Sequence, residues 1–265
     1  MGLLQRLDQS PVFHVLLRGL RLKELAGLVL RRCPLTKTLP GSGVRYRCRY
    51  LETFIGADEI FHRNLYTTAI DPKNVTTFAD LGCNVGLFAA LLAHLTGRRN
   101  LQGIMIDANA EMVDETRWIL SANQMDRVVA VHGLAGAAKA SETAEFYLST
   151  SNLGSSQFPV DEPGKSKKSD WKKVVVPRIN LESLWLAQLG DVRCNVLKVD
   201  IEGSENDFFR SEEAFLRRVD RIVLEWHKWV VSGETVHSTL QQQGFQLVKV
   251  IDENDSIGVA WYRKN

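Results

Sequence analysis

The sequence predicts an α/β protein with a doubly wound, mostly parallel sheet that ends in an antiparallel hairpin. From residue 76 onward, short apolar runs alternate with stretches of helical spacing, and this alternation is typical of a parallel sheet covered on both faces. The last two apolar runs are separated by a polar turn at 253–256 that has no room for a helix, so these strands should pair antiparallel at one edge. A chain of 265 residues can hold one large domain of this kind and an appendage.

The same patterns give the expected order of elements. The expected strands are 44–51, 76–81, 102–107, 127–132, 194–200, 220–226, 245–251 and 257–263, and the expected helices lie near 57–66, 85–96, 109–123, 181–188, 204–216 and 234–243. The pattern weakens within 133–180, where 144–149 and 172–178 are typical of strands. The polar loop between them, 151–172, is long for a compact domain and suits either a lid over a substrate or a surface insertion.

Residues 1–43 are expected to form a basic, amphipathic helical extension, and residues 44–265 the main domain. Apolar residues recur at roughly helical spacing over 11–32, between basic residues. Proline and glycine then interrupt the pattern and predict a linker near 33–43.

Charge is spread unevenly along the chain. The first 50 residues carry a net charge of about +8 and the rest about −6, which suits an anionic surface, a nucleic acid, a subunit contact or a solvated helix face. For the amino-terminal helices we consider a cap over a cofactor, a homodimer contact and a peripheral membrane contact. No apolar run approaches the ~20 residues that span a bilayer. The four cysteines form no Cys-x-x-Cys pair, so a reducing, cytoplasmic location is expected.

A glycine turn between the first strand of the alternating region and its helix predicts a nucleotide-sized pocket. Small residues admit a ligand there, and the free N–H groups of the helix N-terminus face it. The spacing is Asp-x-Gly-x-Asn-x-Gly and not the Gly-x-Gly-x-x-Gly of dinucleotide sites, which argues against a pyrophosphate ligand. The residues expected to contact a cofactor here are Asp80, Gly82, Cys83, Asn84 and Gly86. We expect Cys83 to be a small packing residue, not a nucleophile.

The next strand ends in Asp107, ~20 residues after the glycine turn. A carboxylate at this position can accept hydrogen bonds from both hydroxyls of a ribose. The alternative is that Asp107 caps the helix expected at 109–123, and both roles can coexist. Ala108 belongs to the same predicted cofactor-binding set.

A second polar motif follows the strand at 194–200. Lys198, Asp200, Glu202 and Glu205 lie within eight residues, a density of charge that is costly near a sheet interior unless the groups are paired or used. The next strand supplies two further polar residues, Glu225 and His227, to the same crevice.

With these motifs in place, the chain resembles the FkbM-type S-adenosylmethionine-dependent methyltransferases. The resemblance rests on Asp80–Gly86, the acid Asp107, Leu197–Glu205 and Glu225–His227, and it extends over roughly 76–251. It implies the seven-stranded, Rossmann-like class I methyltransferase fold, S-adenosylmethionine as cofactor, and O-methylation of a hydroxyl on a sugar or natural product. In the family's Leu-Asp-x-Leu segment this chain has Glu182 in place of aspartate.

Transfer to a hydroxyl needs a base, and two residues are candidates. His227 is the first, because imidazole titrates near neutral pH and this one stands at a strand's carboxyl end. Asp200 is the second and also belongs to the cofactor-binding set. The alternative for His227 is a satisfied residue at the edge of the core. Lys198 is expected to neutralise a carboxylate.

The same crevice could hold a divalent metal through Asp200, Glu202, Glu225 and His227. Trp226 and Trp229 could stack on a sugar ring or belong to the core.

Three other functions compete with O-methylation of a small molecule or glycan. A nucleic-acid methyltransferase would use the basic amino-terminal region, but the Asn/Asp-Pro-Pro-Tyr motif and the Pro-Cys pair of base methyltransferases are absent. A nicotinamide oxidoreductase is disfavoured by the glycine spacing. A non-catalytic interaction protein would have no need of the polar motif residues.

Overall fold

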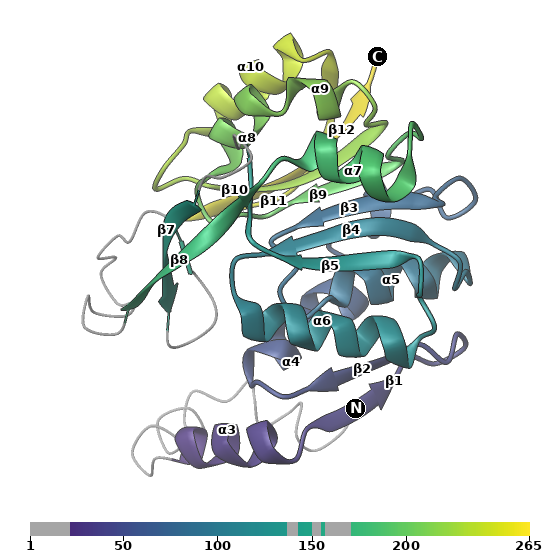
Figure 1. Ribbon diagram of the computed structural model, residues 1–265, viewed down its shortest axis with the longest axis vertical. Coiled ribbons are helices and arrows are strands. Elements are labelled where there is room, and N and C mark those ends of the chain that lie inside the picture. The colour runs from purple at the N-terminus through teal and green to yellow at the C-terminus, as the bar shows by residue number, and fades with distance from the viewer. Residues whose placement is uncertain (1–21, 137–142, 150–154, 157–170) are drawn as a thin grey trace.

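A seven-stranded sheet lies at the centre of the computed structural model, which describes residues 22–136, 143–149, 155–156 and 171–265 (Figure 1). The strand order is β11-β12-β10-β9-β3-β4-β5. The strands are β3 (Thr77–Leu81), β4 (Gln102–Asp107), β5 (Val128–His132), β9 (Val196–Val199), β10 (Arg221–His227), β11 (Phe245–Glu253) and β12 (Ile257–Lys264). Each begins and ends within a few residues of a strand predicted from the sequence.

The sheet is parallel except for β12. β12 pairs antiparallel with both β10 and β11, so β11 runs in the same direction as the other five strands. The antiparallel hairpin predicted at the edge is confirmed, and its second strand fills the gap between β10 and β11. Its turn is closed by Asn254, whose Oδ1 accepts the backbone N–H groups of Ser256 and Ile257.

Helices contact both faces of the sheet, because consecutive side chains of a strand point to opposite faces. On β3, Phe78 belongs to the core cluster with α5 and α6, and Ala79 to the cluster with the helices from α7 to α10. Figure 1 shows these two groups of helices below and above the strands. The helices are α5 (Leu87–Thr96), α6 (Ala110–Ala122), α7 (Leu181–Leu189), α8 (Glu205–Ser211), α9 (Glu213–Leu216) and α10 (Gly233–Gln242).

The single helix predicted at 204–216 is wrong in one respect, because α8 ends and α9 begins around Glu212. This residue has φ −107° and ψ 36°, outside helical geometry. Its carboxylate accepts the backbone N–H of Leu181, at the start of α7. A contact with a segment 31 residues away therefore accompanies the break.

The amino-terminal part differs more from the prediction. It contains α3 (Leu22–Arg32), β1 (Leu35–Thr38), β2 (Arg45–Cys48), α4 (Glu52–Ala57), a π-helical turn (Asp58–His62) and a 3₁₀ turn (Thr67–Ala69). The linker expected near 33–43 is wrong, since β1 lies in it and pairs antiparallel with β2. The helix expected around 57–66 begins at 52 instead. Of the helical extension predicted over 11–32, residues 11–21 lie outside the described part.

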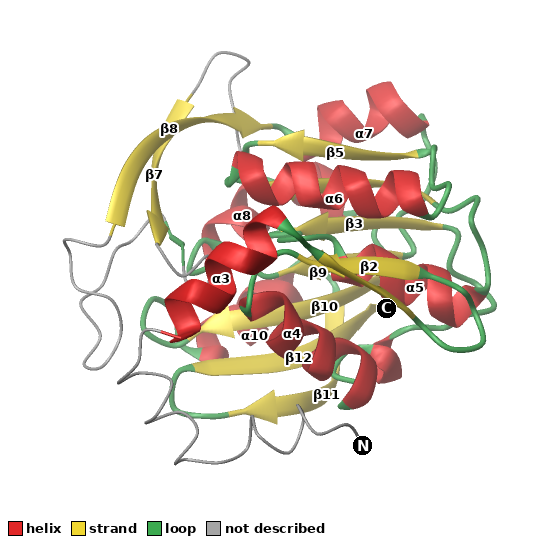
Figure 2. Cartoon of the chain, turned by 90° about the horizontal axis from the view of Figure 1, so that it is seen from below, coloured by secondary structure: helices red, strands yellow, loops and turns green. Residues whose placement is uncertain are grey.

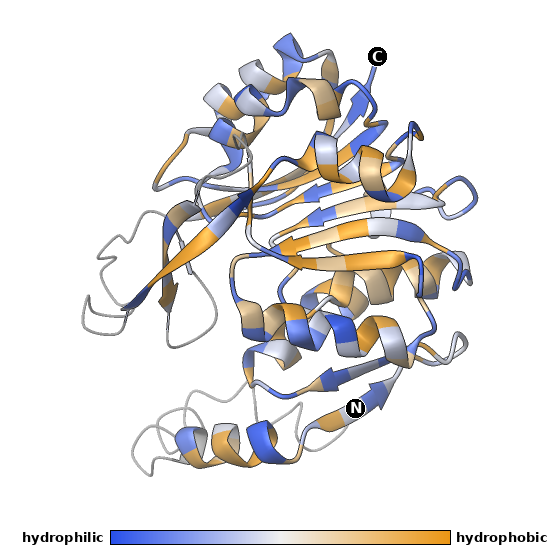
Figure 3. Ribbon diagram, in the orientation of Figure 1, coloured by the Kyte–Doolittle hydropathy of each residue, from blue (hydrophilic) through white to orange (hydrophobic). Residues whose placement is uncertain are grey.

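The β1–β2 hairpin lies beside α6 (Figure 2), and charged side chains join the two. Arg47 donates to both carboxylate oxygens of Glu115 at 2.6 and 2.7 Å, and Arg49 donates to the same carboxylate at 3.0 Å. Glu115 is buried. Figure 3 shows the contrast between the largely hydrophobic β4 and β5 and the hydrophilic β2. Part of the amino-terminal positive charge is thus neutralised inside the protein.

A second sheet, of order β6-β8-β7, extends from the body (Figure 2). It is made of β6 (Leu134–Ala135), β7 (Thr143–Ser149) and β8 (Trp171–Ile179). β7 and β8 confirm the strands predicted at 144–149 and 172–178, whereas the two-residue β6 was missed. The loop predicted at 151–172 lies outside the described residues except for 155–156 and the first residues of β8.

Candidate active site

The glycine turn follows β3 and leads into α5 in a backbone conformation that few residues adopt. Gly82, Asn84 and Gly86 have φ values of +71°, +47° and +87°. A Cβ atom on Gly82 would lie 1.7 Å from the backbone oxygen of Asp200, so only glycine allows β3 and the end of β9 to approach this closely. The turn and the second polar motif are therefore in direct backbone contact.

Asp107, at the end of β4, holds the turn from the other side. Its Oδ2 accepts the backbone N–H of Asn84 at 2.7 Å, and its Oδ1 accepts that of Asn109 at 2.8 Å. The alternative role as helix cap is wrong, because the side chain that caps α6 is that of Asn109. Burial raises the pKa of Asp107 to about 6. Ala108 is buried beside it, and its carbonyl oxygen lies 3.0 Å from Nε2 of His132.

Cys83 confirms the packing interpretation. Its side chain is buried, and burial raises the pKa of its thiol well above the ordinary value, so it carries no nucleophilic thiolate at neutral pH. The Oγ1 of Thr116, on α6, lies 3.5 Å from the sulfur and donates to the carbonyl oxygen of Asn84 at 2.7 Å. Thr116 supports the turn, and no sequence motif around it points to this role.

Asp80 and Lys198 form an ion pair beneath the turn. Nζ of Lys198 lies 3.2 Å from Asp80 and 3.4 Å from Asp200, and it donates to the carbonyl oxygen of Gly82 at 3.0 Å. Burial lowers the pKa of Lys198, but Asp80 and Asp200 outweigh this effect and raise it well above the ordinary value. The Asp80 side chain has no exposed surface. Among the described residues it therefore supports the turn and does not line an open pocket.

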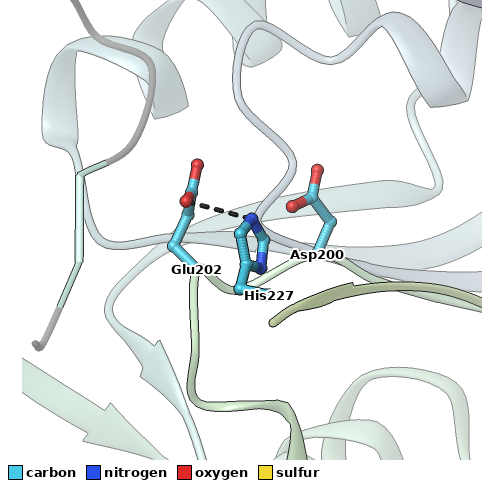
Figure 4. A group of neighbouring side chains, drawn as sticks. All are labelled: Asp200, Glu202 and His227. Carbon is cyan, nitrogen blue, oxygen red and sulfur yellow. Dashed lines mark ion pairs between the residues drawn. The ribbon is translucent and has the colours of Figure 1, made fainter. Parts of the chain in front are cut away.

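His227 ends β10 and is held between the carboxylates of Glu205 and Glu202, of which Figure 4 draws Glu202. Its Nδ1 lies 2.8 Å from Glu205, and its Nε2 lies 3.1 Å from Glu202. Burial lowers the pKa of His227, but hydrogen bonds to these two carboxylates raise it well above the ordinary value. The raised pKa favours the imidazolium form, in which both ring nitrogens carry hydrogen. In this arrangement the imidazolium has no lone pair with which to accept a proton.

Three other residues of the crevice, Glu225, Trp226 and Trp229, have different surroundings. Glu225 lies beside the site, with its Oε1 4.0 Å from Nε2 of His227, and burial together with Asp200 raises the pKa of Glu225 to about 8. Trp226 is fully buried, so it belongs to the core and is not a platform for a sugar. The ring of Trp229 stands edge-on to that of His227, with centroids 5.8 Å apart.

The structure thus brings together nearly all of the residues predicted for the site. It adds Glu205 as the partner of His227. The density of acidic residues at 200–205 indicated that Glu205 needed a partner, but it did not identify His227 as that partner.

Comparison with known proteins decides the family. The Methyltransferase FkbM domain matches residues 62–247. The chain belongs to the FkbM methyltransferase family. It is an S-adenosylmethionine-dependent methyltransferase, as the residue motifs predicted. No curated protein matches the sequence.

Several solved structures resemble this FkbM methyltransferase at low identity. N,N-8-amino-8-demethyl-D-riboflavin dimethyltransferase (RosA) from Streptomyces davawensis is 14% identical, with a TM-score of 0.44 over 81% of this chain and 56% of that one. M. jannaschii TYW2 in complex with AdoMet is 10% identical, with a TM-score of 0.46 over 88% and 87%. Ribosomal protein L11 methylase from Lactobacillus delbrueckii subsp. bulgaricus is 12% identical, with a TM-score of 0.43 over 77% and 79%. The chain spans little more than half the length of RosA.

The donor set fits the cofactor of the FkbM family. A carboxylate has about four lone pairs, and each oxygen of Asp107 uses one for a backbone N–H, so two remain for the hydroxyls of a ribose. Asn84 and the glycines keep the turn free of bulky side chains. Asp107 and the turn are thus the residues that would hold S-adenosylmethionine.

Proposed function

We propose that this chain methylates a hydroxyl group of a small molecule, a sugar or another natural product. The position of Asp200 carries the proposal. Its backbone lies against Gly82 of the cofactor turn, and its side chain, 26% exposed, stands at the end of β9. S-adenosylmethionine supplies a methyl group on a positively charged sulfur, and a hydroxyl that attacks it must lose a proton as the bond forms.

We assign the proton acceptor to Asp200 in preference to His227. The reason is that both ring nitrogens of His227 face carboxylates, whereas the Asp200 carboxylate is partly exposed next to the turn. Lys198 lies 3.4 Å from Asp200 and holds it in place. His227 instead positions Glu202, with which it forms an ion pair.

Calorimetry and a label-transfer assay test the proposal together. Wild type should bind S-adenosylmethionine, Asp107→Ala should weaken this binding, and Asp200→Asn should bind normally but transfer labelled methyl slowly to hydroxyl acceptors. Asp114→Asn, which removes an exposed carboxylate 69% accessible to solvent, is the matched control and should behave as wild type. Label found on nitrogen, or equal transfer rates in Asp200→Asn and wild type, would overturn the proposal.

Methylation of nucleic acid is the less favoured candidate. Three arginines that could have bound phosphates, two on β2 and one directly after it, are engaged within the protein. Arg45 donates to the carbonyl oxygen of Ala122, and Arg47 and Arg49 donate to Glu115. RNA binding that weakens steeply with salt would restore this candidate.

For the amino-terminal helix α3 we propose a peripheral contact with an anionic membrane. Leu25, Leu28 and Val29 are more than half exposed, and Arg31 and Arg32 follow them. No helix in the described part of the chain is long and apolar enough to cross a membrane. Flotation with anionic liposomes at low salt tests the contact, and its absence there would remove it. A homodimer contact and a cytoplasmic location stay predictions.

A further inference from the structure

Three side chains that offer metal ligands meet where β9 and β10 end. Asp200 and Glu202 follow β9, and His227 is the last residue of β10, its parallel neighbour. One ligand atom from each residue lies within 4.8 Å of the other two (Figure 4). At metal–ligand distances of about 2.0–2.2 Å, three atoms around one ion lie about 3–4 Å from one another. Closure of the larger separations by up to about 1 Å, within reach of side-chain rotation, therefore brings the three atoms onto one ion.

Glu205 orients the imidazole for this purpose. It is fully buried, lies 2.8 Å from Nδ1 of His227 and also accepts the backbone N–H of Gly203 at 3.0 Å. The pairing of Nδ1 with a carboxylate leaves Nε2 directed at Glu202. This is the arrangement in which histidine binds a metal through one nitrogen and donates from the other to a carboxylate.

The backbone of Glu202 is strained in the position that this cluster requires. Its φ is +52°, a conformation rare for a residue with a side chain, and Gly203 follows at +100°. Such strain costs of the order of 1–3 kcal/mol and persists where the surroundings maintain it, often at functional sites. The strained turn presents the Glu202 carboxylate to His227.

The charge around the cluster favours a cation. The carboxylates of Asp200, Glu202 and Glu205 lie next to His227, and the carboxyl of Glu225, whose pKa is raised to about 8, lies 4.0 Å from it. The nearby Lys198 is shared between the buried Asp80, 3.2 Å away, and Asp200, 3.4 Å away.

We propose that Asp200, Glu202 and His227 bind one divalent transition-metal cation, with Glu205 as the positioning residue. An imidazole nitrogen together with two carboxylates suits Mn²⁺ or Zn²⁺, whereas Mg²⁺ and Ca²⁺ prefer oxygen ligands alone. The metal takes the place of the Nε2 proton, which leaves to solvent. The purpose of the site rests on the proposed function: a cation next to the cofactor turn would bind the acceptor hydroxyl and lower the pKa of that hydroxyl, and the Asp200 oxygen that does not bind the cation would accept the proton.

Titration with Mn²⁺ alone tests the site without any methyl acceptor. The full chain, freed of metal with a chelator, is titrated with Mn²⁺, and the loss of the free-ion electron paramagnetic resonance signal measures binding. We expect one site per chain, with affinity lowered at least about 10-fold in Glu202→Gln and Asp200→Asn, and about 10–100-fold in Glu205→Gln. Glu213→Gln, which removes an exposed carboxylate paired with Arg217, should bind as wild type.

Calorimetry with S-adenosylmethionine on the same samples shows that each variant is folded and separates this proposal from the proposed function. Normal cofactor binding in Glu202→Gln together with lost Mn²⁺ binding supports the site. Wild type that binds cofactor but shows no saturable Mn²⁺ binding overturns the site and leaves the methyltransferase activity standing. Equal Mn²⁺ affinity in wild type, Glu202→Gln and Asp200→Asn overturns it as well. Displacement of Mn²⁺ by Mg²⁺ as readily as by Zn²⁺ would overturn the part assigned to His227.

Discussion

Replacing Lys198 with methionine removes the cation that faces Asp80 inside the protein. The two side chains are 6% and 0% exposed and lie 3.2 Å apart, so water screens them little. At an effective dielectric constant of about 20, unit charges at this distance attract by about 5 kcal/mol. Removal of one partner of a buried pair costs about 3–5 kcal/mol, because the other charge is left unpaired. We expect Lys198→Met to lose an amount in that range from the free energy of unfolding.

Urea denaturation followed by tryptophan fluorescence measures this loss. The double variant Lys198→Met with Asp80→Leu replaces the pair by apolar groups of similar size and should recover at least about 2 kcal/mol relative to Lys198→Met. The loss should also shrink at acid pH. Burial already raises the pKa of Asp80, and without Lys198 it rises further, so the folded state binds a proton that the unfolded state releases near pH 4. The stability of Lys198→Met therefore increases, relative to wild type, as the pH falls from neutral.

Two results would refute this reasoning. One is a loss below about 1 kcal/mol in the free energy of unfolding of Lys198→Met, which would mean that the buried Asp80 does not need the lysine charge as its partner. The other is a double variant as unstable as the sum of the two single variants, which would mean that the two charges do not interact.

Three further predictions follow from single residues. The pKa of Asp107, about 6, predicts that S-adenosylmethionine binds less tightly as the pH falls through 6, because the protonated carboxyl loses an acceptor. Calorimetry at several pH values measures this, and Asp107→Asn should lose the pH dependence. Gly82→Ala should lower the melting temperature and abolish cofactor binding, because the added Cβ would lie 1.7 Å from the backbone oxygen of Asp200. The control is Gly97→Ala, which has a similar φ of +64° but no atom within 4 Å of the added Cβ. It should show only the cost of the backbone conformation, about 1–2 kcal/mol. Of the four cysteines only Cys33 is exposed, so an aromatic disulfide reagent should titrate one fast thiol in the folded chain.

Each of these has a contradicting result. Equal pH profiles for wild type and Asp107→Asn would remove that carboxylate from the cofactor site. Equal melting temperatures for Gly82→Ala and Gly97→Ala would show that the approach of the two strand ends is loose. Two or more fast thiols would place Cys48, Cys83 or Cys194 within reach of solvent.

The parts of the fold that bury apolar strands were predictable from the sequence. β3 is buried at every position and β4 at most, so their residues read as short apolar runs between glycines and polar turns. β1 was missed because all four of its residues are exposed, so its sequence has no alternation of apolar and polar positions that would indicate a buried face. The break between α8 and α9 was missed because it accompanies a hydrogen bond that Glu212 accepts from Leu181, and no local pattern reveals a contact with so distant a segment.

The site shows the same division between composition and geometry. The residue types at the strand ends could be predicted, because charges next to a buried strand need a purpose. The role of His227 could not, since it depends on the two carboxylates that hold its ring from opposite sides. One of these, Glu205, lies at the start of a helix and not on a strand.

The placement of β12 has a consequence for synthesis of the chain. β10 and β11 are translated before it and become neighbours only through it, because β12 pairs with both. Until Ile257 and the residues after it have emerged from the ribosome, each of these strands has an edge of free N–H and C=O groups that can pair with other chains. A message cut short before this point would therefore yield a product prone to aggregate, even though the residues of the cofactor turn and the acidic cluster were all present.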